Sequence, residues 1–331
     1  MNRFKISRRA VYGLLVCILL AAAACRTDNA FVKNMIIHVG DSKFTEDTLV
    51  QEVVDDPVFG SYGRLIFPVD KDIPEGTRLK DASALLPGYN YVDPARTVDV
   101  VNYMKNEVTH GGTIFFPIYT RYEMEQEPEK ENAGLFFFRG EEGRETAIVS
   151  AGGGFSYVGA IHDSFPQALE LSRRGINAFA LIYRPDEKKG TEDLARAIHY
   201  LCTHADELDI SMDGYSLWGS SSGAKLTAAV GNSGTGMYGE EDHPRPSALV
   251  LEYTNIQDIS DREPPTYAVV GSADDVTPPA IMQNRIDRIR EQGTPAEIEV
   301  FPGLLHGFGA GDRTVAAGWI DRSVLFWEGQ R

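Results

Sequence analysis

From residue 114 to the C-terminus, short apolar runs alternate with longer amphipathic segments. Continuous apolar runs are expected where strands are covered on both faces, because such strands have no solvent-facing side. Eight runs fit this pattern and predict strands at residues 114–119, 135–138, 146–150, 178–183, 215–218, 248–253, 267–270 and 297–301. The alternation therefore predicts an α/β fold with a mainly parallel, doubly wound sheet of eight strands.

The segments between these runs indicate how the strands connect. Only a short polar stretch separates the first two runs, which favours an antiparallel pair at the start of the sheet. From residue 146 onward, long connections can hold crossover helices. Apolar residues at helical spacing predict these helices at residues 164–174, 192–207, 223–230, 279–292 and 316–329.

The first 24 residues differ in composition from the rest of the chain. They contain no acidic residue, an apolar stretch at 10–24, and four basic residues, Arg3, Lys5, Arg8 and Arg9. This pattern is typical of an export signal, and the stretch is shorter than the roughly 20 apolar residues of a transmembrane helix. The run Ala22–Cys25 resembles a lipobox, in which the cysteine is acylated. We therefore expect a signal peptide at 1–24 and a lipid anchor on Cys25, with plain cleavage after Ala24 as the alternative.

Charge and cysteine content restrict the partners of the mature chain. Loss of residues 1–24 removes four positive charges and no negative ones, so the formal net charge goes from −16 to −20. Such a surface repels nucleic acid, and we expect no nucleic-acid partner. Of three cysteines, Cys17 leaves with the signal and Cys25 is the predicted anchor, so Cys202 has no partner for a disulfide. The spacing of Cys and His indicates no metal site, and no cofactor is expected.

Residues 26–113 are harder to interpret. They have mixed polarity and many turn-forming residues, and the apolar run Arg64–Pro68 fits either a strand or a packed loop. We interpret this segment as an N-terminal extension that packs on a catalytic domain at residues 114–331.

The sequence Trp218–Gly223 contains the pattern G-x-S-x-G, with Ser221 at its centre. The pattern lies between an apolar run and a helical segment, and a tight strand-turn-helix is the geometry that exposes a nucleophilic serine hydroxyl. Gly219 and Gly223 fit this interpretation, because side chains would clash in so tight a turn. Ser221 is therefore the candidate nucleophile.

A serine hydroxyl needs a base, and the base needs a group that orients it. In folds with this elbow the chain order is serine, acid, histidine. Asp274 follows the seventh predicted strand, and His306 follows the eighth. Of the adjacent carboxylates Asp274 and Asp275, we select Asp274, which lies three residues past Gly271. We assign surface or packing roles to five other histidines, which are His38, His110, His199, His204 and His243.

A glycine-rich loop, Ala151–Phe155, directly follows the third predicted strand. Consecutive glycines let backbone N–H groups approach a ligand, as an oxyanion hole requires. The loop is therefore the candidate source of one donor, and the N–H group of Ser222, the residue after the candidate nucleophile, is the other. The substrate-binding candidates are Phe155 in this loop, His162 after it, and Tyr253. A helix-entry contact is the alternative role for His162.

Four segments, AGGGFSYV, GSSSGAK, GSADDVTPP and FPGLLHGFG, together resemble the esterase/lipase branch of the α/β-hydrolase superfamily. Within it they are near the prolyl-oligopeptidase-like and the acetyl-xylan or feruloyl esterase relatives, over about residues 114–330. The resemblance implies the α/β-hydrolase fold and a triad of Ser221, Asp274 and His306. It also implies an oxyanion hole formed by Gly153, Gly154 and Ser222. Ala151 departs from the histidine that opens this loop in many lipases and esterases. The short connection at 254–265 leaves no space for a large lid.

The leading hypothesis is a serine esterase that removes short acyl groups, such as acetyl or feruloyl groups on carbohydrate, outside the cytoplasm at a bacterial cell envelope. The enzymatic alternative is a peptidase of the prolyl-oligopeptidase type, but its propeller is far longer than residues 26–113. Acyl transfer to an acceptor other than water is a further alternative. A different class would be a catalytically silent lipoprotein that binds a ligand, and such relatives normally lose a triad member.

Overall fold

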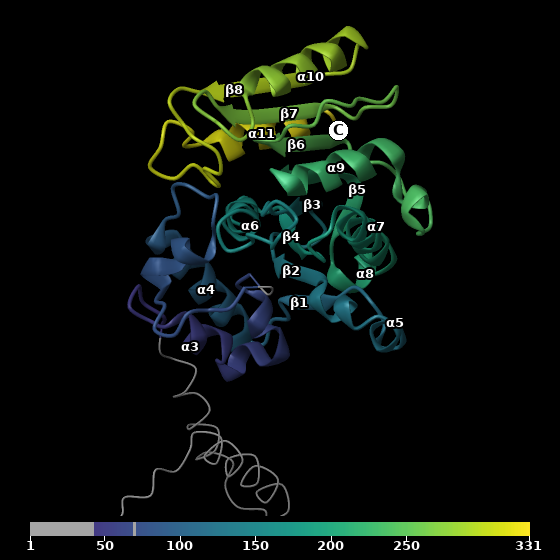
Figure 1. The fold of residues 1–331 in the computed structure, drawn as a ribbon. Helices are drawn as coiled ribbons and strands as arrows, with labels where there is room; N and C mark the ends of the chain where they lie inside the picture. Colours follow the sequence, from purple (N-terminus) through teal and green to yellow (C-terminus); the bar gives the residue numbers. More distant parts are fainter. Residues whose placement is uncertain (1–42, 69–70) are drawn as a thin grey trace, which may run out of the picture. The chain divides into compact units, whose positions relative to one another are not determined.

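One sheet of eight strands organises the chain (Figure 1). The computed structural model describes residues 43–68 and 71–331. The strands are β1 (Phe115–Pro117), β2 (Gly134–Phe138), β3 (Glu145–Ser150), β4 (Asn177–Ile182), β5 (Ser211–Ser220), β6 (Ala248–Glu252), β7 (Thr266–Gly271) and β8 (Ala296–Phe301). Their order is β1-β2-β4-β3-β5-β6-β7-β8. The pairs β1/β2 and β2/β4 are antiparallel, and all other pairs are parallel. The predicted fold class and the antiparallel start are confirmed.

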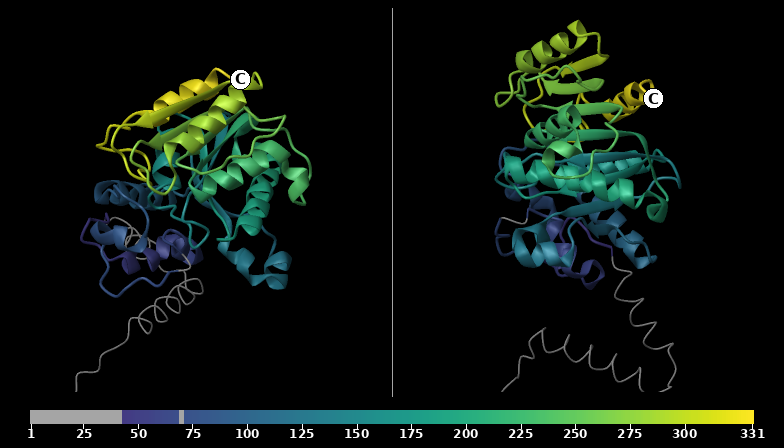
Figure 2. Two further views of the ribbon diagram at one scale, coloured as in Figure 1. Left: turned by 45° about the horizontal axis from the view of Figure 1, so that its top comes forward. Right: turned by 90° about the vertical axis from the view of Figure 1, so that its right-hand side faces the viewer.

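Helices cover both faces of the sheet (Figures 1 and 2). One face carries α6 (Ser164–Ser172) and α11 (Trp319–Glu328), and the other carries α7 (Glu187–Thr203) and α9 (Ser222–Ser233). The chain runs from β3 outward to β4 and then back past β3 to β5, so the winding direction changes beside β3. Ligands bind at the carboxyl ends of strands next to such a switch point.

The remaining elements are shorter or lie at the margins. They are α5 (Arg121–Gln126), η3 (Pro128–Asn132), α8 (Ala205–Leu208), η4 (Thr235–Tyr238) and α10 (Pro279–Glu291), which packs on β7 and β8. The connection between β6 and β7 contains no helix. The expectation that no large lid is inserted there is confirmed.

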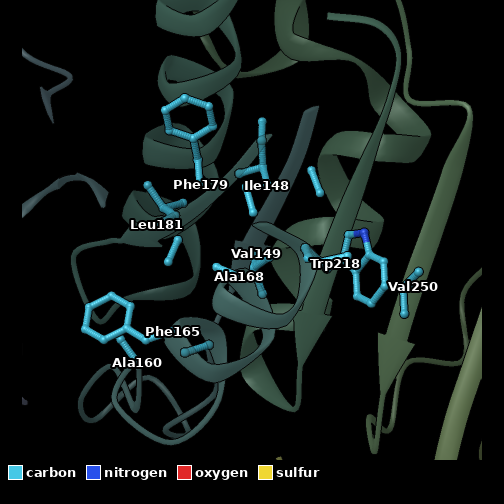
Figure 3. Packing of buried hydrophobic residues seen from close by; sticks show 14 of the residues in the cluster. Ile148, Val149, Ala160, Phe165, Ala168, Phe179, Leu181, Trp218 and Val250 are labelled. Atoms are coloured by element: carbon cyan, nitrogen blue, oxygen red, sulfur yellow. The ribbon is translucent and has the colours of Figure 1, made fainter. Parts of the chain in front are cut away.

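The core is built from the central strands and the helices against them (Figure 3). Every residue of β3 and β4 is buried, including Ile148 and Phe179, and both faces of these strands therefore need apolar side chains. Phe137 stacks on Phe179 with ring centroids 4.2 Å apart. Burying a large apolar side chain contributes about 1.5–3 kcal/mol, so this packing holds the carboxyl ends of the strands in fixed positions.

Residues 44–68 and 71–113 form helices and turns, and no strand occurs among them. They contain α3 (Val50–Val54), η1 (Pro57–Leu65), η2 (Leu79–Leu85) and α4 (Pro94–Thr109). The apolar run at 64–68 consists of the end of η1 and a bend. It is therefore not a strand, which was one of its two interpretations. Arg96 of α4 bonds Asp312 and Glu170, two residues of the larger sheet region. Residues 44–331 together form one compact unit.

The predicted signal peptide and Cys25 lie outside the residues that the structure describes. Within 43–68 and 71–331, none of the helices has both the length and the apolar character needed to cross a membrane.

Candidate active site

Ser221 lies in the turn between β5 and α9. Its φ is 50° and its ψ is −114°, a strained conformation for a residue with a side chain. The Ser221 N–H donates to the Glu252 carbonyl at 2.9 Å, which fixes the turn to the end of β6. A Cβ on Gly223 would lie 2.2 Å from the Ser150 carbonyl oxygen, so the helix can start this close to β3 only with glycine there.

Three consecutive serines at this turn have different surroundings. Ser220 is buried and its Oγ donates to Glu252 Oε2 at 2.9 Å. Ser222 Oγ accepts the Gly154 N–H at 3.0 Å. Ser221 Oγ instead lies 3.1 Å from His306 Nε2. Of the three hydroxyls, that of Ser221 faces an imidazole.

His306 joins Ser221 to a carboxylate. His306 Nδ1 donates to Asp274 Oδ2 at 2.8 Å, and this bond leaves Nε2 as the acceptor for the Ser221 hydroxyl. Asp274 Oδ1 accepts the N–H groups of Val276 and Thr277 at 3.0 and 2.6 Å. The adjacent Asp275 is exposed. The structure brings together the three predicted residues in an arrangement that can move a proton from serine to histidine.

The glycine-rich loop passes directly over the serine turn. A Cβ on Gly152 would lie 2.9 Å from Ser221 Cβ, and one on Gly153 would lie 2.1 Å from the Tyr157 carbonyl oxygen. Gly153 also has a φ of 134°, which side chains rarely adopt. The Gly154 N–H was predicted to be an oxyanion donor, but in the structure it donates to Ser222 Oγ. The role of the Gly153 and Ser222 N–H groups as oxyanion donors stays a prediction.

Comparisons with known proteins agree with this architecture. No protein-family profile matches the chain. An acetyl ester-xyloside bifunctional hydrolase from Caldicellulosiruptor lactoaceticus has a TM-score of 0.56 and 24% identity, over 65% of this chain and 95% of that one. A propionate-bound esterase from Thermogutta terrifontis gives 0.53 and 20%, over 60% and 89%. An α/β hydrolase from a deep-sea metagenome library of the Medee basin gives 0.52 and 21%, over 60% and 92%. The chain has the α/β-hydrolase fold.

A curated relative has a similar level of identity. Endo-1,4-beta-xylanase B of Butyrivibrio fibrisolvens is 24% identical over 218 residues, which cover 53% of this chain and 34% of that protein. The chain therefore spans about a third of the length of this relative.

A buried carboxylate beneath the glycine loop was missed by the sequence analysis of this α/β-hydrolase fold. Asp163 is fully buried and accepts three bonds, from the Tyr89 hydroxyl at 2.5 Å, the Tyr253 hydroxyl at 2.7 Å and the Gly152 N–H at 3.0 Å. Burial, and then the Asp163 carboxylate, raise the pKa of Tyr89 and Tyr253, so both hydroxyls stay protonated. Through these bonds, Asp163 links the glycine-rich loop to Tyr253, which follows β6, and to Tyr89 in the N-terminal segment, residues 44–113.

The N-terminal segment also holds the loop that carries His306. Asn90 Nδ2 donates to the His306 carbonyl at 2.9 Å, and the Leu305 N–H donates to Tyr91 Oη at 3.2 Å. These bonds reach the backbone of the loop rather than the imidazole. Residues 89–91 therefore hold the backbone of the His306 loop in position, although they are far in the sequence from the motifs that contain Ser221, Asp274 and His306.

Two of the three side chains predicted to contact substrate are buried and bonded to other parts of the chain. Tyr253 is fully buried, its ring packs edge-on against His306 at 5.0 Å between centroids, and its hydroxyl is bonded to Asp163. His162 is 7% exposed, and its Nε2 bonds the Gly307 carbonyl at 3.0 Å. Both side chains support the loops from behind. Phe155 is half-buried on the glycine loop and remains a candidate.

Glu252 lies under the serine turn and is fully buried. It accepts bonds from Ser220 Oγ and from Gln167 Nε2 at 2.7 Å. Burial, and then the charge of Asp163, raise the pKa of Glu252 well above its usual value. Burial therefore favours the protonated form of this side chain over the ionised form.

An open groove of about 670 Å³ runs along the outer face of α9. It starts at Lys225, one helical turn after Ser221, and Lys225 Nζ lies 5.9 Å from the centre of the Phe155 ring. The opposite wall is the connection after β6. The lining is mainly polar and includes Glu187, Asn232, Tyr238, Asn255, Gln257, Asp258 and Ser260.

Proposed function

We propose that the chain is a serine hydrolase that cleaves carboxylic esters through an acyl-enzyme on Ser221. The observation that carries this proposal is the 3.1 Å contact between Ser221 Oγ and His306 Nε2, with His306 Nδ1 held by Asp274 at 2.8 Å. A serine in a strained turn that faces a carboxylate-oriented imidazole is the arrangement required for nucleophilic attack on a carbonyl.

In the proposed reaction, His306 takes the hydroxyl proton as Ser221 Oγ attacks the ester carbonyl. The N–H groups of Gly153 and Ser222 would stabilise the negative oxygen of the tetrahedral intermediate. His306 then gives its proton to the alcohol oxygen as the bond to the alcohol breaks. Water attacks the acyl-enzyme with His306 as base again, which releases the acid and restores Ser221. Asp274 stays ionised and stabilises the imidazolium.

Short acyl groups suit the site best. The connection after β6 contains no helix that could wall a long acyl tunnel. The esterase from Thermogutta terrifontis has been described with propionate and with butyrate bound, and it is phosphorylated by paraoxon. We therefore propose acetyl to butyryl esters as substrates, in preference to esters of about ten or more carbons, because little protein is available to bury so many methylene groups.

The alcohol is proposed to be a carbohydrate. Polar side chains line the groove beside α9, and a sugar presents hydroxyls that hydrogen-bond with such groups. Two similar proteins have names that refer to xylan or xylosides. They are the acetyl ester-xyloside bifunctional hydrolase and endo-1,4-beta-xylanase B. Feruloyl esters of carbohydrate are the second acyl class that we propose to test.

The direct test is steady-state hydrolysis of p-nitrophenyl esters from acetate to decanoate, followed by acetylated and feruloylated xylo-oligosaccharides. We expect Ser221→Ala to lose at least about 10⁴-fold in kcat/KM. The matched controls Ser220→Ala and Ser222→Ala keep at least about a tenth of the activity, because neither hydroxyl contacts His306. Full activity in Ser221→Ala would refute the proposal.

The same panel separates the alternatives. Covalent labelling by a fluorophosphonate without ester turnover, but with cleavage of proline-containing peptides, would indicate a peptidase. Neither labelling nor turnover would indicate a silent scaffold. A preference for decanoate over butyrate would contradict the proposed acyl range.

We further propose that the protein is exported and anchored by a lipid on Cys25. The basic residues at 3–9, the apolar stretch at 10–24 and the Ala-Ala-Ala-Cys junction support this. Intact mass of membrane-extracted protein should correspond to a chain that begins at acylated Cys25. An unmodified N-terminus, or a Cys25→Ala protein that stays in the membrane fraction, would contradict the anchor.

A further inference from the structure

His199, Glu241 and His243 come together far from Ser221. His199 is on α7, and the other two are in the loop between η4 and β6. His199 Nδ1 and His243 Nε2 face each other at 2.9 Å, and a Glu241 carboxylate oxygen joins them so that the three atoms lie within 4.8 Å of one another. The two histidines are 44 positions apart, so their spacing along the chain predicts no metal site. The grouping arises only from the fold.

The geometry fits a small divalent ion. Tetrahedral Zn²⁺ with bonds of about 2.0–2.1 Å to nitrogen holds its ligand atoms about 3.3 Å apart. The two ring nitrogens need to separate only slightly from 2.9 Å to reach that spacing. The exposed Glu241 carboxylate is free to swing to an ion, and water can complete the coordination. We propose that His199, Glu241 and His243 bind one divalent transition-metal ion of the Zn²⁺ class.

The loop that supplies two of the ligands is already held in place. The buried Thr235 hydroxyl donates to the Glu241 carbonyl at 2.5 Å and accepts the His243 N–H at 3.0 Å. Arg196, about one turn before His199 on α7, pairs with Glu240 at 2.6 Å. The backbone of the loop and the helix therefore need little rearrangement to bind an ion, which keeps the entropic cost of binding small.

Cys202 is near the cluster but is not one of the proposed ligands. Burial, and then the Glu241 carboxylate, raise the pKa of the Cys202 thiol to about 11. The Cys202 sulfur is not among the ligand atoms that lie within 4.8 Å of one another, so the ligand set consists of imidazole and carboxylate. This ligand set favours Zn²⁺, Ni²⁺ or Cu²⁺ over Mg²⁺ or Ca²⁺, which prefer oxygen ligands.

The position of the site indicates a structural role. His199 is near the end of α7, and the loop with Glu241 and His243 leads into the start of β6. Both points belong to the amino edge of the parallel strands, whereas Ser221, Asp274 and His306 follow their carboxyl ends. A bound ion would fasten α7 to the η4–β6 loop and would not touch the reacting groups.

The test is Zn²⁺ titration of metal-free protein, without a polyhistidine tag, by calorimetry and by thermal unfolding. We expect one Zn²⁺ per chain and a Tm increase of roughly 5 °C at 100 times the Kd, since this ratio stabilises the folded state by about 2.7 kcal/mol. Mg²⁺ and Ca²⁺ should give no shift. His199→Ala and His243→Ala should each weaken binding at least about tenfold, with ester hydrolysis unchanged within about twofold.

Two controls keep the assignment specific. His204→Ala removes a nearby histidine outside the cluster, and Cys202→Ser removes the thiol; both should bind Zn²⁺ like the wild type. Circular dichroism checks that each variant is folded, and His243→Gln replaces His243→Ala if the latter is unfolded. Absence of a stoichiometric site, binding unchanged in the variants at 199 and 243, or binding lost only in Cys202→Ser would overturn the proposal.

Discussion

Two regions of the molecule contribute to the candidate active site in different ways. Residues 114–331 form a regular sheet, and the turns at its carboxyl edge carry Ser221, Asp274 and His306. Residues 44–113 have no strand within their described part. Even so, Tyr89 bonds Asp163 beneath the glycine-rich loop, and Asn90 bonds the carbonyl of His306. In the proposed mechanism, the sheet region supplies the reacting groups and residues 44–113 hold the backbone around them in position.

The largest expected effect lies within the regular region and separates Asp274 from Asp275. Asp274→Asn should lower kcat by about 10⁴-fold with little change in KM, because the amide cannot hold the required imidazole tautomer. Asp275→Asn, the matched control, should stay within about tenfold, since Asp275 is exposed and Asp274 makes the bond to His306. Steady-state kinetics with one short ester measures both. The reverse ranking would move the acid role to Asp275.

A smaller effect is expected at the contact between the two regions, where Tyr89 bonds Asp163, and it tests whether residues 44–113 matter for catalysis. Tyr89→Phe removes one bond to Asp163 and should lower kcat by about tenfold, because the glycine loop loses part of its support. Asp163→Asn should cost about 100-fold, since the bond to Gly152 is weakened as well. KM should change by less than about threefold in both variants.

The control for Tyr89→Phe is Tyr157→Phe, which removes a neighbouring tyrosine hydroxyl that bonds the Pro87 carbonyl instead of Asp163. This variant should keep its kcat within about twofold. Equal losses in both tyrosine variants would mean that residues 44–113 act only through general stability.

Much of the sheet, and the grouping of Ser221, Asp274 and His306, could be predicted because the signals are local. Each apolar run matches one strand, and parallel strands bring their carboxyl ends to one edge, so Ser221, Asp274 and His306 had to lie near one another. The Asp163 contacts had no local signal. Its hydroxyl partners lie 74 and 90 positions away in the chain, and only tertiary packing brings them together.

Side-chain direction was the other limit of the sequence analysis. Tyr253 directly follows β6 at the carboxyl edge of the sheet and was predicted to contact substrate. Its φ is 33°, and this unusual turn accompanies a side chain that is buried against His306 and Asp163. The Gly154 N–H was likewise assigned to the oxyanion, but it bonds the neighbouring Ser222. Neither direction follows from residue type or spacing.

The smallest predicted effect concerns stability rather than rate, and involves Glu252 beneath the serine turn. Its pKa is raised in the folded state above the usual 4.5, so the folded protein binds this proton more tightly than the unfolded chain. The free energy of unfolding should therefore fall as pH rises above about 4.5, by at most about 1.4 kcal/mol per pH unit until the folded pKa is reached.

Glu252→Gln removes this proton and can keep the bond to Ser220, so the variant should lose that part of the pH dependence and be more stable than the wild type near pH 8. Urea unfolding at pH 5 and pH 8 measures the difference. A wild type and variant with parallel pH profiles would mean that Glu252 is ionised in the folded state.

The most direct test of the central claim is to treat the folded protein with paraoxon and map the adduct by peptide mass spectrometry. The proposed site predicts one diethyl phosphoryl group per chain, on Ser221, formed at least about 100-fold more slowly in His306→Ala because the base is missing. Ser220 and Ser222 should remain unmodified in the same peptide. An adduct on any other residue, or a protein that stays unmodified while folded, would contradict the assignment of Ser221 as the nucleophile.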